Sequence, residues 1–260
     1  MDRSDLPVLV VGAGPVGLAA ALEVRRRGLP VAVLECDPPD RVRPGSRAMF
    51  VHRRSLRLLE EAAPGLGQQL AEHGVCWRAR RTLYRGREVY SRDYPAPPSG
   101  SLPPFTSLRQ TETERLLAVA CAQAGVEFRW SARVTEVRSD PAGVTVSTAD
   151  GTSLSASYVI AADGARSAVR RSLGLAIAGA RSAGFHVVLD VEDDPDEPAT
   201  TERLFHYEHP DAGGRSVMRV PFAGGFQIDL QCRDDDQPED FGTREAVARW
   251  LPRLVGPEHV

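Results

Sequence analysis

Residues 8–35 read VLVVGAGPVGLAAALEVRRRGLPVAVLE, and this stretch decides the fold of the N-terminal part. The apolar run Val8–Val11 enters a glycine-rich turn of the form G-x-G-x-x-G, and an apolar helix follows it. Gly28 stands where that helix should end, and a second apolar run, Val31–Leu34, leads into Glu35. A strand, a glycine turn, a helix and a strand that ends in an acid predict a βαβ unit that binds a dinucleotide.

The glycine turn has a physical reason at each position. Gly12 permits the tight turn, Gly14 lets a pyrophosphate approach the backbone, and Gly17 lets the helix pack closely on the strand. Glu35 lies 23 residues after Gly12, where it can accept hydrogen bonds from ribose hydroxyls. It would repel a 2′-phosphate, but both FAD and NAD fit this unit. We expect cofactor contacts from Gly12, Gly14, Pro15, Val16, Gly17 and Glu35.

The composition narrows the class of protein. The 260 residues carry a formal net charge of −3, which gives no case for a nucleic acid or a membrane surface as partner. No segment reaches the ~18 apolar residues of a membrane span, and no signal sequence is recognisable, so a cytoplasmic protein is expected. All 32 basic residues are arginine, which excludes a lysine Schiff base. The scattered cysteines predict reduced thiols and no metal site.

The first domain is expected to cover residues 1–178. Apolar residues recur at helical spacing over 52–63 and 111–124, with Gly125 just past the second helix. Alternating apolar and polar residues over 133–156 predict a small antiparallel β ribbon.

Two other segments of this domain are read from their composition. The apolar run Tyr158–Ala162 predicts a buried strand that returns to the parallel sheet, after a short strand at Val126–Trp130. Residues 82–108 are rich in Pro, Ser, Gly and Tyr, which predicts an irregular excursion with few strands.

A second domain is expected over residues 179–260, after a linker of the composition GARSAG. Gly, Pro and Asp turns separate several short strand candidates, which predict an antiparallel sheet. These candidates are Phe185–Val191, Leu204–His209, Ser216–Val220 and Phe226–Cys232. Residues 243–254 predict a last helix. The expected fold class is therefore α/β, a Rossmann-like domain followed by an antiparallel β-sheet domain.

A second motif lies at residues 158–174, YVIAADGARSAVRRSLG. Taken alone, it could be a plain strand, turn and helix. Together with the first motif, it resembles the p-hydroxybenzoate hydroxylase-like family of FAD-dependent aromatic hydroxylases, which carry D-G-x-x-S-x-x-R at this distance. The resemblance implies that Asp163, Gly164 and Ser167 serve FAD and the nicotinamide, with Arg170 in the arginine position.

Two further segments resemble the same family. GSRAMFVHRRSLRLLEE, residues 45–61, places Arg47 where the family has an arginine beside the flavin, although Arg53 replaces a frequent proline. LRQTETERLL, residues 108–117, places Gln110 where a glutamine reaches the ribityl chain. A solvated loop arginine and a polar residue at a helix start are the alternative readings of these two side chains.

The family's third motif, a G-D-A-A-H-like segment, does not occur in this sequence. The resemblance therefore implies an incomplete substrate domain, either because the chain is part of a longer protein or because a second polypeptide supplies the rest.

The resemblance implies a monooxygenase that uses NADPH or NADH and O2 to hydroxylate an aromatic or polyketide-type substrate through a flavin C4a-hydroperoxide. GGFQIDLQC is similar to an actinobacterial secondary-metabolism subgroup, as in antibiotic biosynthesis. The alternatives are a non-hydroxylating flavin oxidoreductase, a non-catalytic half that needs a partner chain and, less fitting, a plain NAD-dependent dehydrogenase.

Substrate contacts are expected from the second domain's sheet, although core packing explains any one of its side chains equally well. His206 is the candidate base for a phenol, with His186 and His209 as competitors. The candidate substrate contacts are Met218, Arg219, Phe222, Phe226 and Gln227.

Overall fold

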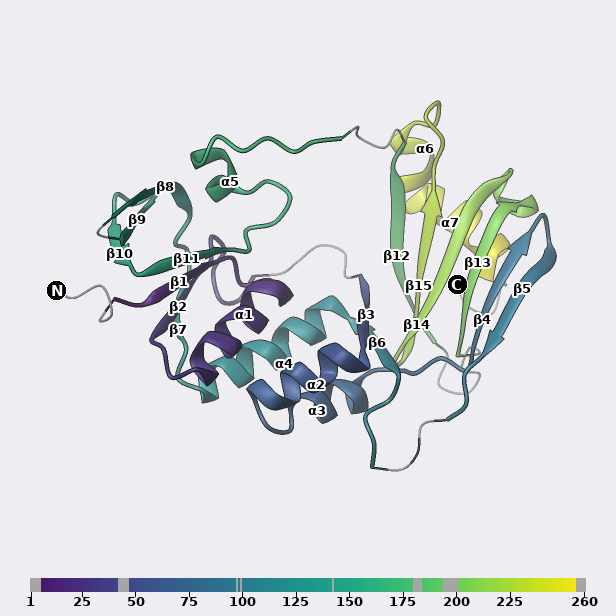
Figure 1. Cartoon of the computed structure of the whole chain (residues 1–260). Coiled ribbons are helices and arrows are strands. Elements are labelled where there is room, and N and C mark those ends of the chain that lie inside the picture. Colours follow the sequence, from purple (N-terminus) through teal and green to yellow (C-terminus); the bar gives the residue numbers. More distant parts are fainter. Residues whose placement is uncertain are drawn as a thin grey trace. The chain divides into compact units, whose positions relative to one another are not determined.

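The computed structural model describes residues 6–41, 47–96, 98, 100–141, 143–179, 184–193 and 201–255. The contacts divide the chain into two compact units, which alternate along the sequence (Figure 1). Unit 1 comprises Met1–Arg43, Arg57–Gln69 and Glu112–Gly179; unit 2 comprises Pro44–Leu56, Leu70–Thr111 and Ala180–Val260. The sequence predicts one division, after residue 178, whereas the contacts assign two earlier segments to unit 2.

Unit 1 is built on a parallel four-stranded sheet in the order β11-β1-β2-β7. Its strands are β1 (Val8–Val11), β2 (Val31–Leu34), β7 (Glu127–Arg129) and β11 (Tyr158–Ala161). The predicted βαβ unit is confirmed, because α1 (Pro15–Arg26) connects the parallel strands β1 and β2. Gly28 has a φ of +77°, a left-handed conformation that lets the chain leave the helix.

Two layers cover this parallel sheet. Helix α4 (Gln110–Gln123) packs on α1, where the Cys121 thiol lies 3.4 Å from the Leu18 carbonyl oxygen. The other layer is an antiparallel ribbon of three strands, β8 (Val134–Asp140), β9 (Gly143–Thr148) and β10 (Ser153–Ala156). Its apolar side packs against Leu9 and Val11 of β1. Unit 1 also contains residues of the shorter helices α2 (Arg53–Ala62), α3 (Leu66–His73) and α5 (Ala168–Ser172).

The strand predicted at Tyr158–Ala162 does return to the parallel sheet, but the expectation that it is buried is wrong. Among the described residues β11 pairs with β1 alone and forms an edge of the sheet, and its Tyr158 is 63% exposed. An apolar run of four residues does not show whether a strand is central or at an edge.

Unit 2 is built on a six-stranded sheet in the order β12-β15-β14-β13-β4-β5. All neighbours are antiparallel except β13 and β4. The four strands predicted in the second domain are present as β12 (His186–Glu192), β13 (Glu202–His209), β14 (Arg215–Phe222) and β15 (Gly225–Gln231). A 3-10 turn (Pro210–Ala212), α6 (Pro238–Gly242) and α7 (Arg244–Val255) complete this part.

The expectation of a strand-poor excursion over residues 82–108 is wrong. β4 (Ala79–Tyr84) and β5 (Arg87–Asp93) form a hairpin that extends the six-stranded sheet. β6 (Phe105–Arg109) pairs with β3 (Ala48–His52) in a two-stranded ribbon. β5 is exposed along its whole length, so its sequence lacks the apolar alternation on which strand prediction depends.

The six-stranded sheet has two different faces, because side chains alternate along each strand. Phe226, Ile228 and Leu230 of β15 point to the face that packs against Leu251 and Val255 of α7. We call this the α7 face. The other face, here the opposite face, carries the alternate residues, among them Asp190, Met218, Val220, Gln227 and Asp229. Among the described residues, every helix is too short or too polar to cross a membrane.

Candidate functional site

Two glycines of the first motif are required by close backbone contacts. Gly12 has a φ of +103°, and a Cβ there would lie 2.5 Å from the carbonyl oxygen of Ala162. A Cβ on Gly17 would lie 1.9 Å from the carbonyl oxygen of Gly12. The first glycine turn therefore packs directly against the end of β11, which brings the two predicted cofactor motifs together.

Gly14 is different, because a Cβ there would meet nothing within 4 Å. It is the N-cap of α1, where no side chain accepts a hydrogen bond from the helix N–H groups. Pro15 opens the helix, and Val16 is 72% exposed. An open backbone with free N–H groups at the positive end of a 12-residue helix fits a pyrophosphate group.

The Glu35 carboxylate is buried behind this turn and is held by four donors. Oε2 accepts the Ala13 N–H at 2.7 Å and pairs with Arg41 Nη1 at 2.7 Å. Oε1 accepts the Asp37 N–H at 3.1 Å and the Cys36 thiol at 3.2 Å. Burial alone would raise the pKa of Glu35, but the hydrogen bonds from Arg41, Ala13, Cys36 and Asp37 outweigh it and lower the pKa to about 2.

These four donors occupy both oxygens of Glu35, so a ribose hydroxyl that bound here would have to replace one of them. The thiol is the weakest donor of the set. Burial and the neighbouring Glu35 carboxylate raise the pKa of Cys36 to about 11, so its sulfur keeps its proton. A ribose hydroxyl bound at Glu35 would therefore replace the Cys36 thiol most easily.

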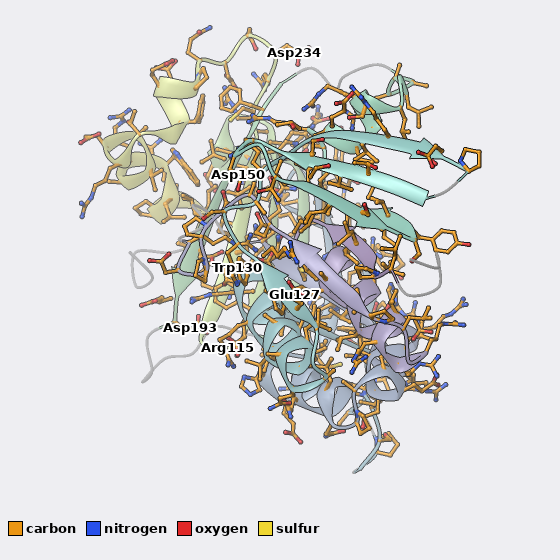
Figure 2. The ribbon with its side chains drawn as sticks, turned by 90° about the vertical axis from the view of Figure 1, so that its left-hand side faces the viewer. Arg115, Glu127, Trp130, Asp150, Asp193 and Asp234 are labelled. Carbon is orange, nitrogen blue, oxygen red and sulfur yellow. The ribbon has the colours of Figure 1, made fainter. Side chains whose placement is uncertain are left out.

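Arg41 is a further member of this site, and no sequence pattern indicates it. Its Nη2 donates to the Ala13 carbonyl at 2.9 Å and lies 3.4 Å from Glu114 Oε2. Its guanidinium stands 5.9 Å from the ring of Trp130. Figure 2 labels Trp130, which follows β7 in the chain. Arg41 thus ties the glycine turn to the acid at the end of β2. Nothing in a polar, Pro-rich loop distinguishes it from a solvated arginine.

The second motif folds as a capped turn. Asp163 Oδ2 accepts the N–H groups of Ala168 at 2.6 Å and Val169 at 3.1 Å. Ser167 is the N-cap of α5, and its Oγ accepts the Arg170 N–H at 2.9 Å. Gly164 has a φ of +74° with open space around it. The side chains of Asp163 and Ser167 thus stabilise the turn itself, and their contacts with a cofactor remain a proposal.

Replacing Ser167 with alanine should lower the free energy of unfolding by about 1 kcal/mol, because the N–H group of Arg170 loses its acceptor. Ser167→Asn should recover most of that loss, since asparagine is an equally good N-cap. Urea denaturation of the three proteins measures the difference. Equal stability of the alanine and asparagine variants would show that capping is not the role of this hydroxyl.

Arg47 and Gln110 both belong to unit 2, and they flank the paired residues Ala48 and Arg109 at one end of the β3–β6 ribbon. The Gln110 N–H donates to the Arg47 carbonyl at 2.7 Å, so the two predicted flavin contacts are neighbours. Gln110 is the first residue of α4, and the Arg47 side chain is exposed. Their contacts with the flavin stay a prediction.

The predicted substrate residues lie on both faces of the six-stranded sheet. Met218, Phe222 and Gln227 occupy the opposite face by register. Gln227 is buried, and its Oε1 accepts the Ala48 N–H at 2.7 Å. The expectation for Phe226 has to be corrected, because its fully buried ring lies in the core with α7. Arg219 stacks on that ring at 4.2 Å and shares the α7 face.

His206 also points to the α7 face, where its neighbour on β14 is Val217. Its Nε2 accepts the N–H of Gly86 at 2.9 Å. Burial and the neighbouring His209 lower its pKa. An imidazole held neutral in this way supports the turn between β4 and β5. Its role as a base remains a prediction from the sequence.

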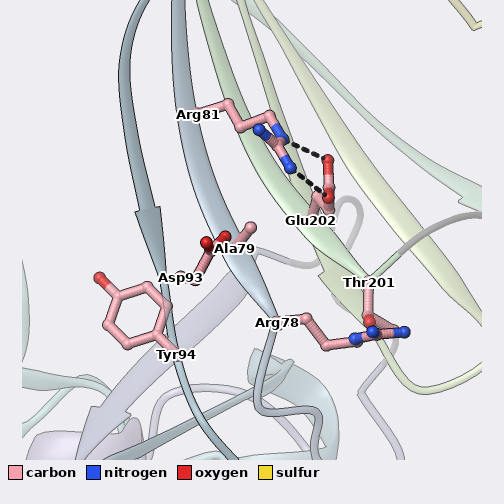
Figure 3. A pocket seen from close by; sticks show the side chains of 7 residues that line it. All are labelled: Arg78, Ala79, Arg81, Asp93, Tyr94, Thr201 and Glu202. Atoms are coloured by element: carbon pink, nitrogen blue, oxygen red, sulfur yellow. Dashed lines mark hydrogen bonds and ion pairs between the residues drawn. The ribbon is translucent and has the colours of Figure 1, made fainter.

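A pocket of about 470 Å³ lies beside β4, β5 and β13. Arg81 crosses it to make a two-pronged ion pair with Glu202, at 2.9 and 3.1 Å (Figure 3). Its other lining residues are Arg78, Ala79, Asp93, Tyr94 and Thr201. None of these residues belongs to the predicted cofactor motifs.

Comparisons with known proteins agree with this geometry. The family described as FAD binding domain matches residues 5–260. The rifampicin monooxygenase of Rhodococcus hoagii is 32% identical over 267 residues, which cover 95% of this chain and 53% of that relative. The 6-methylpretetramide 4-monooxygenase of Streptomyces rimosus is 33% identical over 226 residues, which cover 83% of this chain and 38% of that relative.

The fold also matches solved structures. A ternary complex of aklavinone-11 hydroxylase with FAD and aklavinone superposes with a TM-score of 0.78 at 24% identity, over 100% of this chain and 52% of that chain. The chain thus spans about half, or less, of the length of these relatives.

Proposed function

The chain belongs to the FAD-binding-domain family of flavin-dependent aromatic hydroxylases, and from this premise we propose that it takes part in an NADPH- or NADH- and O2-dependent hydroxylation. The proposed substrate is an aromatic or polyketide-type molecule that carries a hydroxyl group. In support, the names of two relatives at 32 and 33% identity give rifampicin and 6-methylpretetramide as the molecules on which those relatives act.

The observation that carries the proposal is the open cradle around Gly14. The free N–H groups of α1 would bind the pyrophosphate, and Glu35, oriented by Arg41, would accept a ribose hydroxyl. Gly12 keeps the turn close to Ala162, the residue that follows β11, and Gly164 comes two residues later in the chain. Bound FAD supplies the redox chemistry of oxygen transfer, while the protein binds, orients and shields.

Incubating the purified chain with FAD and removing free FAD by gel filtration should leave a yellow protein. The retained visible bands of the isoalloxazine ring measure this binding directly. A colourless protein would contradict a flavin site formed by these residues.

Oxygen transfer requires a separate measurement. Oxidation of NADPH or NADH should depend on an added phenol, and oxygen from 18O2 should appear in the product. Turnover without the label would instead indicate a non-hydroxylating flavin oxidoreductase.

A further inference from the structure

An imidazole and a carboxylate form a close pair on the opposite face of the six-stranded sheet. His186 Nδ1 lies 2.6 Å from Asp229 Oδ1. His186 begins β12, and the register sets Asp229 of β15 against Val188, two residues further along the same strand. The two side chains are therefore diagonal neighbours on one face, which is within reach of a direct hydrogen bond.

The pairing defines the chemistry of the ring. An ionised carboxylate only accepts hydrogen bonds, so Nδ1 carries the proton and donates to Asp229. Nε2 is then the basic nitrogen, as in a carboxylate-oriented catalytic histidine. Among the described residues, none hydrogen-bonds to this Nε2. The His186 side chain is 48% exposed and that of Asp229 is 21% exposed, so a ligand can approach the pair.

The surroundings of the pair suit an aromatic ligand. Met218 is directly opposite Asp229, and Phe205 is directly opposite Met218. The Phe205 and Tyr207 rings are 4.4 Å apart, and Tyr207 is 48% exposed. The face beside the pair thus carries a thioether and aromatic side chains, groups that contact aromatic ligands. Met218 itself packs against the cluster of Trp77, Phe105 and Val220.

The same face leads to the predicted flavin contact within unit 2. Asp229 and Gln227 are two residues apart on β15, a separation of ~7 Å. Gln227 in turn holds the Ala48 N–H, and Ala48 follows Arg47 in the sequence. His206, the base that the sequence favours, points to the α7 face instead.

We propose that His186 and Asp229 are the proton-accepting pair for an acidic hydroxyl of the substrate. The O–H bond of the bound phenol breaks and its proton forms an N–H bond at Nε2, which leaves a phenolate beside an imidazolium. Asp229 stays ionised and stabilises that imidazolium, and no electron is transferred. The exposed edge of the ring returns the proton to solvent. This proposal rests on the proposed function, in which oxygen is transferred to an aromatic ring. A phenolate ring is more electron-rich than the ring of the neutral phenol and is therefore the better acceptor of oxygen.

The test uses 4-nitrophenol, whose phenolate is yellow, and the full chain without turnover. Titrating the bound probe with pH should show that the chain lowers the apparent pKa of the phenol by about 1–3, the effect of an imidazolium within contact distance. Other charged or titratable groups on this face or beside it stay constant between the variants. They are Arg109, Asp190, Glu192, Arg203 and Tyr207.

His186→Gln should abolish the pKa shift while the probe still binds, because glutamine hydrogen-bonds but takes up no proton. Asp229→Asn should reduce the shift, since Asp229 only positions and stabilises the ring, and the double variant should match His186→Gln. His206→Gln is the comparison variant, and we expect the wild-type shift in it. An unchanged shift in His186→Gln, a shift lost in His206→Gln, or a probe that binds only as the neutral phenol would overturn the proposal.

FAD retention is measured on the same variants. If the phenolate forms but no flavin binds, the proposed function fails while the proton-accepting pair stands. If flavin binds and the phenol stays neutral, the pair fails while the proposed function stands.

Discussion

Gly17→Ala is expected to lower the free energy of unfolding by about 3 kcal/mol and to abolish FAD retention. The new methyl group would lie 1.9 Å from the Gly12 carbonyl oxygen, which is backbone and can move only with the glycine turn. Overpacking of this kind costs about 1–3 kcal/mol or more, and helix propensity returns only about 1 kcal/mol. Urea denaturation and the flavin absorbance after gel filtration are the two measurements.

Gly14→Ala is the matched comparison, because it adds the same methyl group at a position that has no close packing contact. Its backbone, with φ −79° and ψ 176°, suits alanine, and the methyl group would enter open space. We expect a stability change under about 1 kcal/mol. FAD affinity should nevertheless fall at least about tenfold, because the methyl group occupies the approach of the pyrophosphate. Undiminished FAD affinity in this variant would refute the assignment of the cradle.

Glu35→Gln should also cost about 3 kcal/mol at neutral pH, because it leaves the buried Arg41 guanidinium without its nearest carboxylate. The ribose would lose its charged acceptor, so FAD affinity should fall as well. Glu23→Gln is the control, since Glu23 pairs with Arg26 and Arg27 on the exposed surface of α1. Its effect on stability should be close to zero. Equal losses in the two variants would contradict a special role for the buried pair.

The Glu35 carboxylate also predicts that the free energy of unfolding decreases at acidic pH. Glu35 has a pKa of about 2 in the folded protein, against 4.5 as its ordinary value. Between these two pH values the unfolded chain binds a proton that the folded protein does not, so stability falls as the pH is lowered from 4.5 to 2. Glu35→Gln removes this group and should flatten that part of the profile. A series of urea denaturations across this pH range gives the slope.

The first cofactor motif was predictable because the local backbone geometry requires each residue type in it. Positive φ at Gly12 and the close approach at Gly17 are demands of the backbone, and they reach the sequence as glycines at fixed spacing. Arg41 could not be predicted, because its role depends on three partners that are distant in the chain or lie in irregular loops. The sequence around an arginine in a polar loop does not indicate which residues it contacts.

The sheet of unit 2 shows a different limit. Its four later strands alternate well enough to be recognised, but alternation alone does not tell which face α7 covers. Phe226 and Gln227 are adjacent in the sequence, and only the register separates the core from the opposite face. The contact between His186 and Asp229 could not be predicted either, because the two residues are 43 positions apart and only the strand register brings them together.

The alternation of the two units along the chain has a consequence for synthesis on the ribosome. β1 emerges first, yet its neighbour β11 is some 150 positions later in the chain, at Tyr158–Ala161. At about 5–20 residues per second, the nascent chain carries an unpaired edge of β1 for many seconds. Chaperone capture of ribosome-bound chains should therefore be strongest before residue 161 leaves the exit tunnel.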